Sequence, residues 1–199
     1  MSGVLLVLLS LLALPAAAQT DAPALPRVAI ETSAGRIVLE VDTARAPVTA
    51  GNFLRYVDQK RLDGVTFYRV VKVQDHFGFV QFGANGAPAR ILPPIRHEPT
   101  SVTGVKHLDG TISTARLAPG TARGDFTISV GDQPSFDAGS GSPADNLGYA
   151  AFGRVVEGMD VVLQIFDAPV SPTATVRGAF RGQVPVAQVR IVSARRVKP

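Results

Sequence analysis

The sequence predicts a mainly β protein, a closed antiparallel β-barrel of about eight strands capped by two α-helices. Short segments rich in β-branched and aromatic residues recur along the chain, with turn residues between them. Only two segments, residues 47–58 and 159–166, place apolar side chains at helical spacing. Strands and helices do not alternate as they do in β-α-β units, so an antiparallel arrangement is favoured.

The first 26 residues precede the predicted domain. Residues 4–14 are almost wholly apolar and lead through Pro15 into three alanines, a pattern typical of a secretory signal peptide. We expect residues 1–18 to be this signal, with cleavage before Gln19, and residues 19–26 to be a flexible leader. This stretch of eleven residues is too short to span a bilayer, which takes about 20. A retained anchor is the alternative, because no Lys or Arg precedes the apolar run.

The elements of the predicted domain follow in order. Residues 27–33 and 36–41 alternate apolar and polar side chains around a short turn, which predicts a hairpin. Pro47 is tolerated in a first helical turn, and helical spacing continues to residue 58. Two central strands are predicted at 65–71 and 77–83, followed by a loop at 83–94 that is rich in Gly, Ala and Pro.

The second half of the chain predicts strands at 110–116 and 125–130 and a long loop at 131–148. A further strand at 150–155, the helix at 159–166 and a closing strand at 185–192 complete the domain, which we place at residues 27–194. A loop as long as 131–148 in a compact domain is often functional. Residues 195–199 are predicted to be a solvated basic tail.

Composition narrows the function classes. Without the signal, about 180 residues remain, enough for one domain with a sizeable core. The chain has no cysteine, which excludes disulfides and thiol chemistry. None of the three histidines has a partner at metal-ligand spacing, so we expect neither a metal nor a cofactor. The net charge of +4 is spread along the chain, so nucleic-acid binding is not expected.

An arginine inside an apolar strand is the most informative residue. Arg69 lies among Phe67, Tyr68 and Val70, and strand alternation predicts that it shares a face with Phe67 and Val71. A guanidinium does not deprotonate, and burying it unpaired is costly. Two interpretations stay open: a structural ion pair at a sheet edge, or a fork of donors held over an apolar pocket.

Four segments then resemble the cyclophilin family of peptidyl-prolyl cis-trans isomerases. They occur in the family's order, at residues 46–54, 67–70, 79–83 and 150–162. The resemblance runs from about residue 28 to residue 192 and so covers nearly all of the chain after the signal. It implies the cyclophilin barrel and an isomerase of Xaa-Pro bonds.

The resemblance also implies roles for individual residues. Arg69 is similar to the catalytic arginine, and Gln81 to the residue that fixes the substrate backbone. An apolar wall and a closing ring are implied for Phe79, Phe136 and Tyr149, for which ordinary core packing is the alternative. Ala115 and Arg116 match the strand that pairs with the substrate, although the family more often has Asn at the second position.

Some pocket positions depart from the family pattern. Asp125 stands where the family usually has Gln, and could pair with Arg69. Thr127 stands where it usually has Phe, which removes the aromatic floor of the proline pocket. The loop 72–77 is longer than usual, so the other pocket phenylalanine could be placed at residue 77 or 79. Phe77 could then also fill the space at Thr127.

We therefore expect a monomeric, periplasmic or secreted isomerase. It would act on proline-containing polypeptides and assist their folding, without stable membrane association after signal cleavage. The alternative is a weak or inactive cyclophilin-like module that binds peptides or acts as a chaperone, and the substitutions at Asp125 and Thr127 are what favour it.

Overall fold

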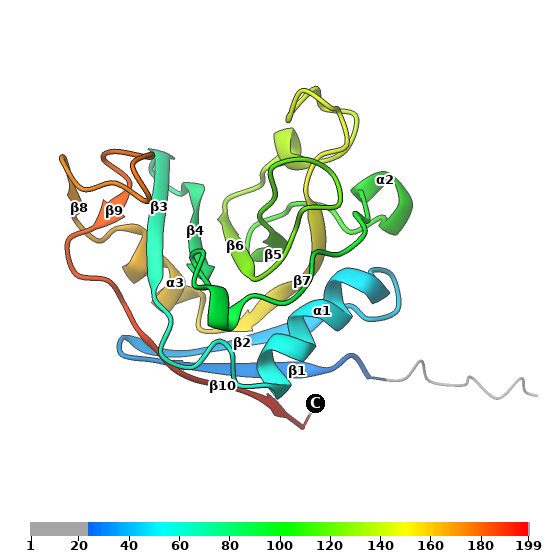
Figure 1. The fold of residues 1–199 in the computed structure, drawn as a ribbon, viewed down its shortest axis with the longest axis horizontal. Coiled ribbons are helices and arrows are strands. Elements are labelled where there is room, and N and C mark those ends of the chain that lie inside the picture. The colour runs from blue at the N-terminus through cyan, green and yellow to red at the C-terminus, as the bar shows by residue number, and fades with distance from the viewer. Residues whose placement is uncertain (1–23, 199) are drawn as a thin grey trace, which may run out of the picture.

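The computed structural model describes residues 24–198, which are built around one antiparallel sheet (Figure 1). Its order is β10-β1-β2-β7-β5-β6-β4-β3. The strands are β1 (Arg27–Thr32), β2 (Gly35–Val41), β3 (Phe67–Gln74), β4 (Phe77–Gly83), β5 (Thr111–Thr114), β6 (Asp125–Val130), β7 (Ala150–Glu157) and β10 (Ile191–Val197). A separate two-stranded sheet joins β8 (Val170–Ser171) to β9 (Val184–Pro185).

Three α-helices accompany the sheet: α1 (Pro47–Asp58), α2 (Thr100–Thr103) and α3 (Met159–Phe166). Two 3₁₀ turns, Pro88–Arg90 and Pro134–Phe136, lie in the connecting loops. The two longer helices are those predicted from helical spacing, with the predicted bounds. The prediction of two helices misses α2, because four residues are too short to show a helical period.

Phenylalanine side chains form the centre of the core. Phe53 of α1 packs edge-on against Phe126 of β6 with ring centroids 5.1 Å apart, and lies 5.3 Å from Phe152 of β7. Phe67 and Phe82 stack across β3 and β4 with centroids 4.9 Å apart. All five rings are fully buried, so the curled sheet wraps its apolar face around α1, as burial of aromatic area favours.

The sheet is curled but is not the closed ladder that we predicted. The edge strands β3 and β10 are not paired with each other in the strand order. An isolated bridge between Thr66 and Arg190 lies at this seam, and the amide of Phe67 donates to the carbonyl of Val189 at 2.9 Å. The prediction of a closed barrel is therefore wrong at the seam between β3 and β10, where contact is limited to bridging hydrogen bonds.

The closing strand lies further along the chain than predicted. Val184–Pro185 pairs with β8 instead, and β10 runs to Val197 alongside β1. The guanidiniums of Arg195 and Arg196 pair with Asp63 and Asp58, each with a nitrogen–oxygen distance of 2.7 Å. The predicted basic tail is thus wrong as far as Val197, because an arginine can face solvent while its backbone pairs in a sheet.

A bulge in β3 changes which side chains share a face. Phe67 pairs with Phe82 and Arg69 with Gln81, which leaves Tyr68 as an extra residue. Phe67 is in the core, whereas Tyr68 and Arg69 both line a cleft. The prediction that Arg69 shares a face with Phe67 is wrong, because simple alternation does not hold across a bulge.

The expected signal peptide and most of the expected leader lie outside the described residues. Within residues 24–198, no helix is both long enough and apolar enough to cross a membrane.

Candidate active site

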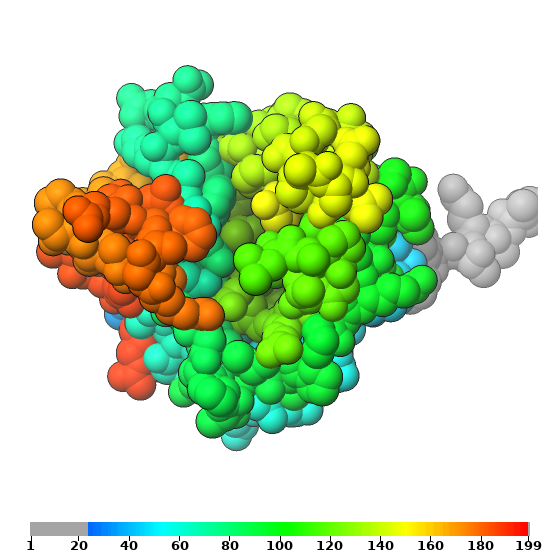
Figure 2. Space-filling view, turned by 45° about the horizontal axis from the view of Figure 1, so that its top comes forward, coloured from blue at the N-terminus to red at the C-terminus, as the bar shows by residue number. Residues whose placement is uncertain are grey.

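All the site residues predicted from the sequence line one cleft of about 870 Å³. They are Arg69, Phe79, Gln81, Ala115, Arg116, Asp125, Thr127, Phe136 and Tyr149. Strands β3, β4 and β6 supply one face of the cleft, and the loops at 115–124 and 131–149 supply another. The remaining lining comes from Gly86 and Ile91 in the loop after β4 and from the segment 172–183 between β8 and β9, here called the strap. Figure 2 shows the hollow between the strap, in orange, and the yellow and green loops.

Arg69 is held by uncharged groups. Its Nε donates to Oε1 of Gln183 at 2.7 Å, and its Nη1 donates to Oε1 of Gln81 at 3.1 Å. The guanidinium carbon lies 3.7 Å from the ring centroid of Phe180 and 5.2 Å from that of Phe79. Gln183 and Phe180 belong to the strap, so this wall fixes both the edge and one face of the guanidinium.

The environment of Arg69 leaves it charged and able to donate. Within residues 24–198 no carboxylate lies within 4.0 Å of its nitrogens. The interpretation of Arg69 as an ion-paired structural residue is therefore wrong. Two of its five N–H groups are used by the glutamines. Burial lowers the pKa of the guanidinium, because an apolar surrounding disfavours its charged form.

Aromatic side chains form the apolar wall of the cleft. Phe79 meets Phe136 edge-on with centroids 5.8 Å apart, and Phe136 meets Tyr149 with centroids 5.3 Å apart. Phe79 is the phenylalanine that lines the cleft. Phe77 lies instead against Gly131, where a Cβ added to that glycine would be 3.6 Å from its ring. The open choice between the two is settled by strand register, and Phe77 does not fill the space at Thr127.

Thr127 forms the floor of the cleft beside the catalytic candidates. It is paired with Gln81 on β4 and with Ser113 on β5. Its hydroxyl lies 2.9 Å from that of Ser113, so the two side chains share a hydrogen bond. A small polar side chain therefore occupies the position between the aromatic wall and Gln81.

Contrary to our expectation, Asp125 does not pair with Arg69. Its Oδ1 accepts hydrogen bonds from the hydroxyl of Tyr68 at 3.1 Å and from the amide of Asn85 at 2.8 Å. Burial raises the pKa of Tyr68, and the Asp125 carboxylate raises it further, so the phenol stays a donor. The expected contact is absent because Asp125 is in register with Gly83, while Arg69 is in register with Gln81.

The environment of Arg116 differs from the substrate-pairing role that the resemblance to the cyclophilin family implied. Its side chain is buried, and its Nη1 and Nη2 pair with both oxygens of Asp145 at 2.7 and 2.8 Å. Its Nε donates to the carbonyl of Gly148 at 2.9 Å. The pair holds the pKa of Asp145 at about 2. Arg116 thus fastens the loop 131–149, while Ala115 lines the cleft and donates its amide to the carbonyl of Asp125.

Sequence reasoning missed the residues of the strap and the neighbours of the bulge. Tyr68, Arg123, Arg177 and Phe180 line the cleft, and Gln183 reaches Arg69. Arg177 also donates to Oδ1 of Asn85 at 3.3 Å, which ties the strap to the opposite loop. The one available signal was an isolated phenylalanine in a polar segment, Phe180, which is still half exposed.

Residues 27–196 match the family described as cyclophilin type peptidyl-prolyl cis-trans isomerase/CLD. The match covers most of the chain and includes every residue of the cleft. The chain therefore belongs to the cyclophilin-type peptidyl-prolyl cis-trans isomerase family.

Bacterial relatives agree with this assignment. The chain is 38% identical to peptidyl-prolyl cis-trans isomerase cyp18 of Streptomyces antibioticus, over 84% of this chain and 96% of that protein. It is 33% identical to peptidyl-prolyl cis-trans isomerase B of Escherichia coli, over 83% and 96% of the two chains. A crystal structure of a Cryptosporidium parvum cyclophilin type isomerase shares the fold with a TM-score of 0.68 at 17% identity, covering 88% of this chain and 99% of that one.

The described chain offers no obvious site for a bound metal. Within residues 24–198 no group of three or more His, Cys, Asp or Glu side chains could hold a metal ion. The groups that the cleft does offer are hydrogen-bond donors and acceptors beside an apolar wall. Their chemistry is that of binding and orienting a peptide.

Proposed function

We propose that this cyclophilin isomerises Xaa-Pro bonds in exported polypeptides and so assists their folding. The observation that carries the proposal is the position of Arg69, a charged and partly buried donor beside an aromatic wall. The family and the named activities of the bacterial relatives support the reaction class. The apolar run at residues 4–14 and the alanines at 16–18 support export through a signal cleaved before Gln19.

The reaction needs no nucleophile. A peptide bond resists rotation by about 18–20 kcal/mol, because resonance gives its C–N bond partial double-bond character. Twisting the bond localises a lone pair on the prolyl nitrogen, and a donor that meets this lone pair stabilises the twisted amide. The N–H groups of Arg69 that neither glutamine uses can supply that donor.

The other cleft residues hold the peptide on either side of the bond. Phe79, Phe136 and Tyr149 form the wall against which the proline ring packs. Gln81 holds Arg69 through Oε1, and its amide group is left to bind the substrate backbone. Ala115 follows β5 directly and lines the cleft, so its backbone is the one we assign to pairing with a peptide strand.

Arg69→Ala tests the proposal directly. In a protease-coupled assay on a short Xaa-Pro peptide, the variant should lose about 100-fold in kcat/KM, the usual loss for one preorganised donor. Thermal melts of the two proteins are the control for folding. A wild-type protein without activity would reject the proposal in favour of a module that only binds peptides. A variant that keeps the wild-type kcat/KM would show that Arg69 does not carry the activity.

A further inference from the structure

Three segments that rim the cleft carry arginines and no acidic residue. They are the loop 84–96, the segment 115–124 and the strap at 172–183. Their arginines are Arg90, Arg96, Arg116, Arg123, Arg177 and Arg181. Among the residues that line the cleft Asp125 is the one acid, and the loop 131–149, which also lines it, carries Asp132, Asp137 and Asp145.

The acids of that loop are already engaged. Asp145 pairs with Arg116, and Asp137 accepts from His107 Nδ1 at 2.8 Å and lies 3.5 Å from Lys106. Asp132 accepts from the amide of Asp109. Of the residues that line the cleft, Asp125 is the one carboxylate, and the Tyr68 hydroxyl and an amide already bind it.

The positive charges of three arginines that line the cleft are not neutralised by a carboxylate of the described residues. Arg69, Arg123 and Arg177 have no carboxylate within 4.0 Å in residues 24–198. Arg123 and Arg177 are exposed, and the hydrogen bond of Arg177 goes to the neutral side chain of Asn85. Since a cleft with low-dielectric walls concentrates the field of its charges, this one is positive inside.

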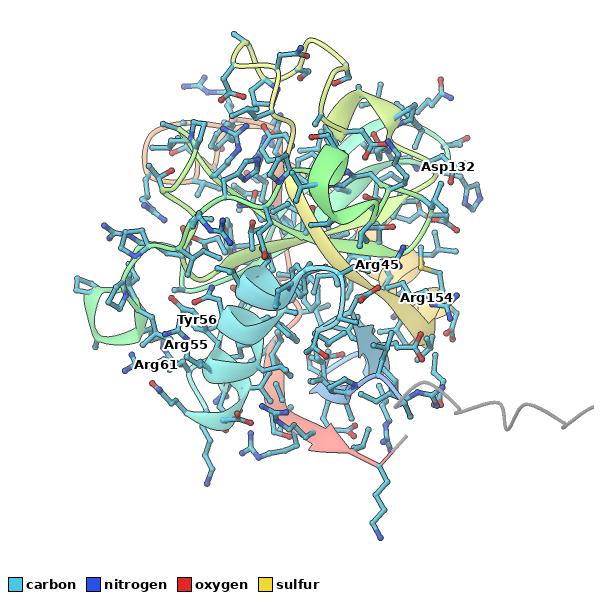
Figure 3. All side chains as sticks on the ribbon, turned by 90° about the vertical axis from the view of Figure 1, so that its right-hand side faces the viewer. Arg45, Arg55, Tyr56, Arg61, Asp132 and Arg154 are labelled. Atoms are coloured by element: carbon cyan, nitrogen blue, oxygen red, sulfur yellow. The ribbon has the colours of Figure 1, made fainter. Side chains whose placement is uncertain are left out.

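Arginines elsewhere on the molecule are mostly neutralised. Arg154 pairs with Glu40 at 3.0 Å, and Arg45 pairs with Asp42. Figure 3 shows Arg45 and Arg154 together on one side, and Arg55 and Arg61 beside Tyr56 on the other. The latter two bind the Asn52 side chain and the Ala89 carbonyl rather than acids. Most of the arginines without an ion pair in residues 24–198 therefore line the cleft or belong to the three segments that rim it.

We propose that the cleft selects proline-containing peptides with acidic side chains two residues before and two residues after the proline. The inference rests on the proposed function, since it names the substrate class of the same cleft. Exposed guanidiniums attract carboxylates over a Debye length of about 8–10 Å and bind them with two parallel hydrogen bonds. A basic flank would instead meet like charge from all three arginines.

A matched set of peptides tests this selection. All peptides would have an acetylated N-terminus, an amidated C-terminus and the same sequence except at two positions. These positions, the second residue before the proline and the second residue after it, would both be Glu, Gln or Lys. Exchange NMR would give the isomerisation rate and fluorescence anisotropy the Kd. We expect the Glu peptide to exceed the Lys peptide about tenfold in kcat/KM at low salt and about twofold at 0.5 M salt, because salt screens exposed charges.

Variants locate the effect. Arg123→Gln combined with Arg177→Gln should reduce the Glu/Lys ratio at least about threefold. Asp125→Asn should raise the ratio, since it removes the one carboxylate lining the cleft. Arg190→Gln is the matched control: Arg190 is exposed, has no ion pair in the described residues and lies outside the cleft lining. This control should leave the ratio unchanged.

The outcomes separate the two proposals. A Glu/Lys ratio near one, or a ratio that the double variant does not change, overturns the selection while the turnover of the Gln peptide upholds the isomerase. If no peptide is turned over, the isomerase proposal fails, and the ratio of Kd values still decides the selection. Tighter binding of a short single-stranded oligonucleotide than of the Glu peptide would show a site for polyanions and also overturn it.

Discussion

Arg69 is oriented by neutral partners, and this bears on how it can act. A carboxylate partner would attract the guanidinium in the ground state, and that attraction would be partly lost on contact with a twisted amide. Gln81 and Gln183 fix the geometry through single hydrogen bonds without neutralising the charge. The ring of Phe180 covers one face of the guanidinium, and the two glutamines use two of its five N–H groups.

Thr127 limits the grip of the cleft on a proline ring. Thr127→Phe should restore apolar area at the floor, and Phe77 does not compete for this space. At roughly 25 cal/mol per Å², a gain of about 1 kcal/mol would lower KM about fivefold. We expect kcat to change little, because Arg69 and Gln81 are untouched. Steady-state kinetics of the variant measure this split.

Thr127→Val is the control for the lost hydroxyl. It removes the hydrogen bond to Ser113 without adding an aromatic ring. The valine variant should not show the lowered KM. If the phenylalanine variant raises KM instead, the floor is already well packed and added volume only strains it.

At the scale of elements, sequence patterns predict what local periodicity encodes. The ranges of β4, β6, α1 and α3 agree with prediction because their apolar residues repeat at the period of a strand or helix. Two features escape this logic. The β3 bulge depends on how β3 pairs with β4, and the strap depends on a contact between residues 114 positions apart along the chain, Gln183 and Arg69. The resemblance therefore found Arg69 and Gln81 but not Gln183 and Phe180, the groups of the strap that hold Arg69.

The first turn of helix α1 is bound by a buried carboxylate, which no nearby sequence pattern predicted. The oxygens of Glu98 accept from the amides of Val48 and Thr49 at 3.1 and 2.7 Å. The same helix holds the cleft segment 115–124, since Nδ2 of Asn52 donates to the carbonyl of Arg123 at 2.8 Å. The negative charge also complements the positive end of the helix.

Glu98→Ala should therefore destabilise the fold. The part-buried amide of Val48 and the buried amide and hydroxyl of Thr49 would lose their acceptor, and we expect a loss of about 2–3 kcal/mol in the free energy of unfolding. Urea titrations measure it. The control is Glu157→Ala at an exposed position, where the change should stay within about 0.5 kcal/mol. Equal effects for both variants would show that the carboxylate does not stabilise α1.

At the scale of the molecule, the strand order and its seam decide the shape. Amino-acid patterns predict a barrel, but whether the edge strands β3 and β10 pair depends on how far the sheet curls. The prediction that the charged end of β10 is a solvated tail was wrong for a related reason. Arg195 and Arg196 are fixed by Asp63 and Asp58, which come from a distant part of the chain.

A buried histidine makes the stability of the whole molecule depend on pH. His107 is buried with its Nδ1 2.8 Å from Asp137, and burial lowers its pKa despite this carboxylate. The unfolded chain, with a histidine pKa near about 6.5, binds a proton before the folded chain does. Stability is thus complete above this pH and falls as the pH drops toward the folded pKa.

The free energy of unfolding should decrease between about pH 7 and pH 5, by up to about 1.4 kcal/mol per pH unit for one proton. In His107→Gln this slope should be smaller. His97, whose pKa burial also lowers, supplies the remainder. Urea titrations across the range give both slopes. An identical slope in the two proteins would assign the pH dependence to other groups.

The most direct test of the central claim, that the planar donor fork of Arg69 carries catalysis, is the kcat of Arg69→Lys. Lysine keeps the charge but replaces the fork by a point ammonium. Exchange NMR on a saturating Xaa-Pro peptide would give kcat and KM separately. We expect a kcat at least about tenfold lower with KM within about twofold of wild type, because the lost contact belongs to the twisted amide. A kcat equal to that of the wild type would contradict it.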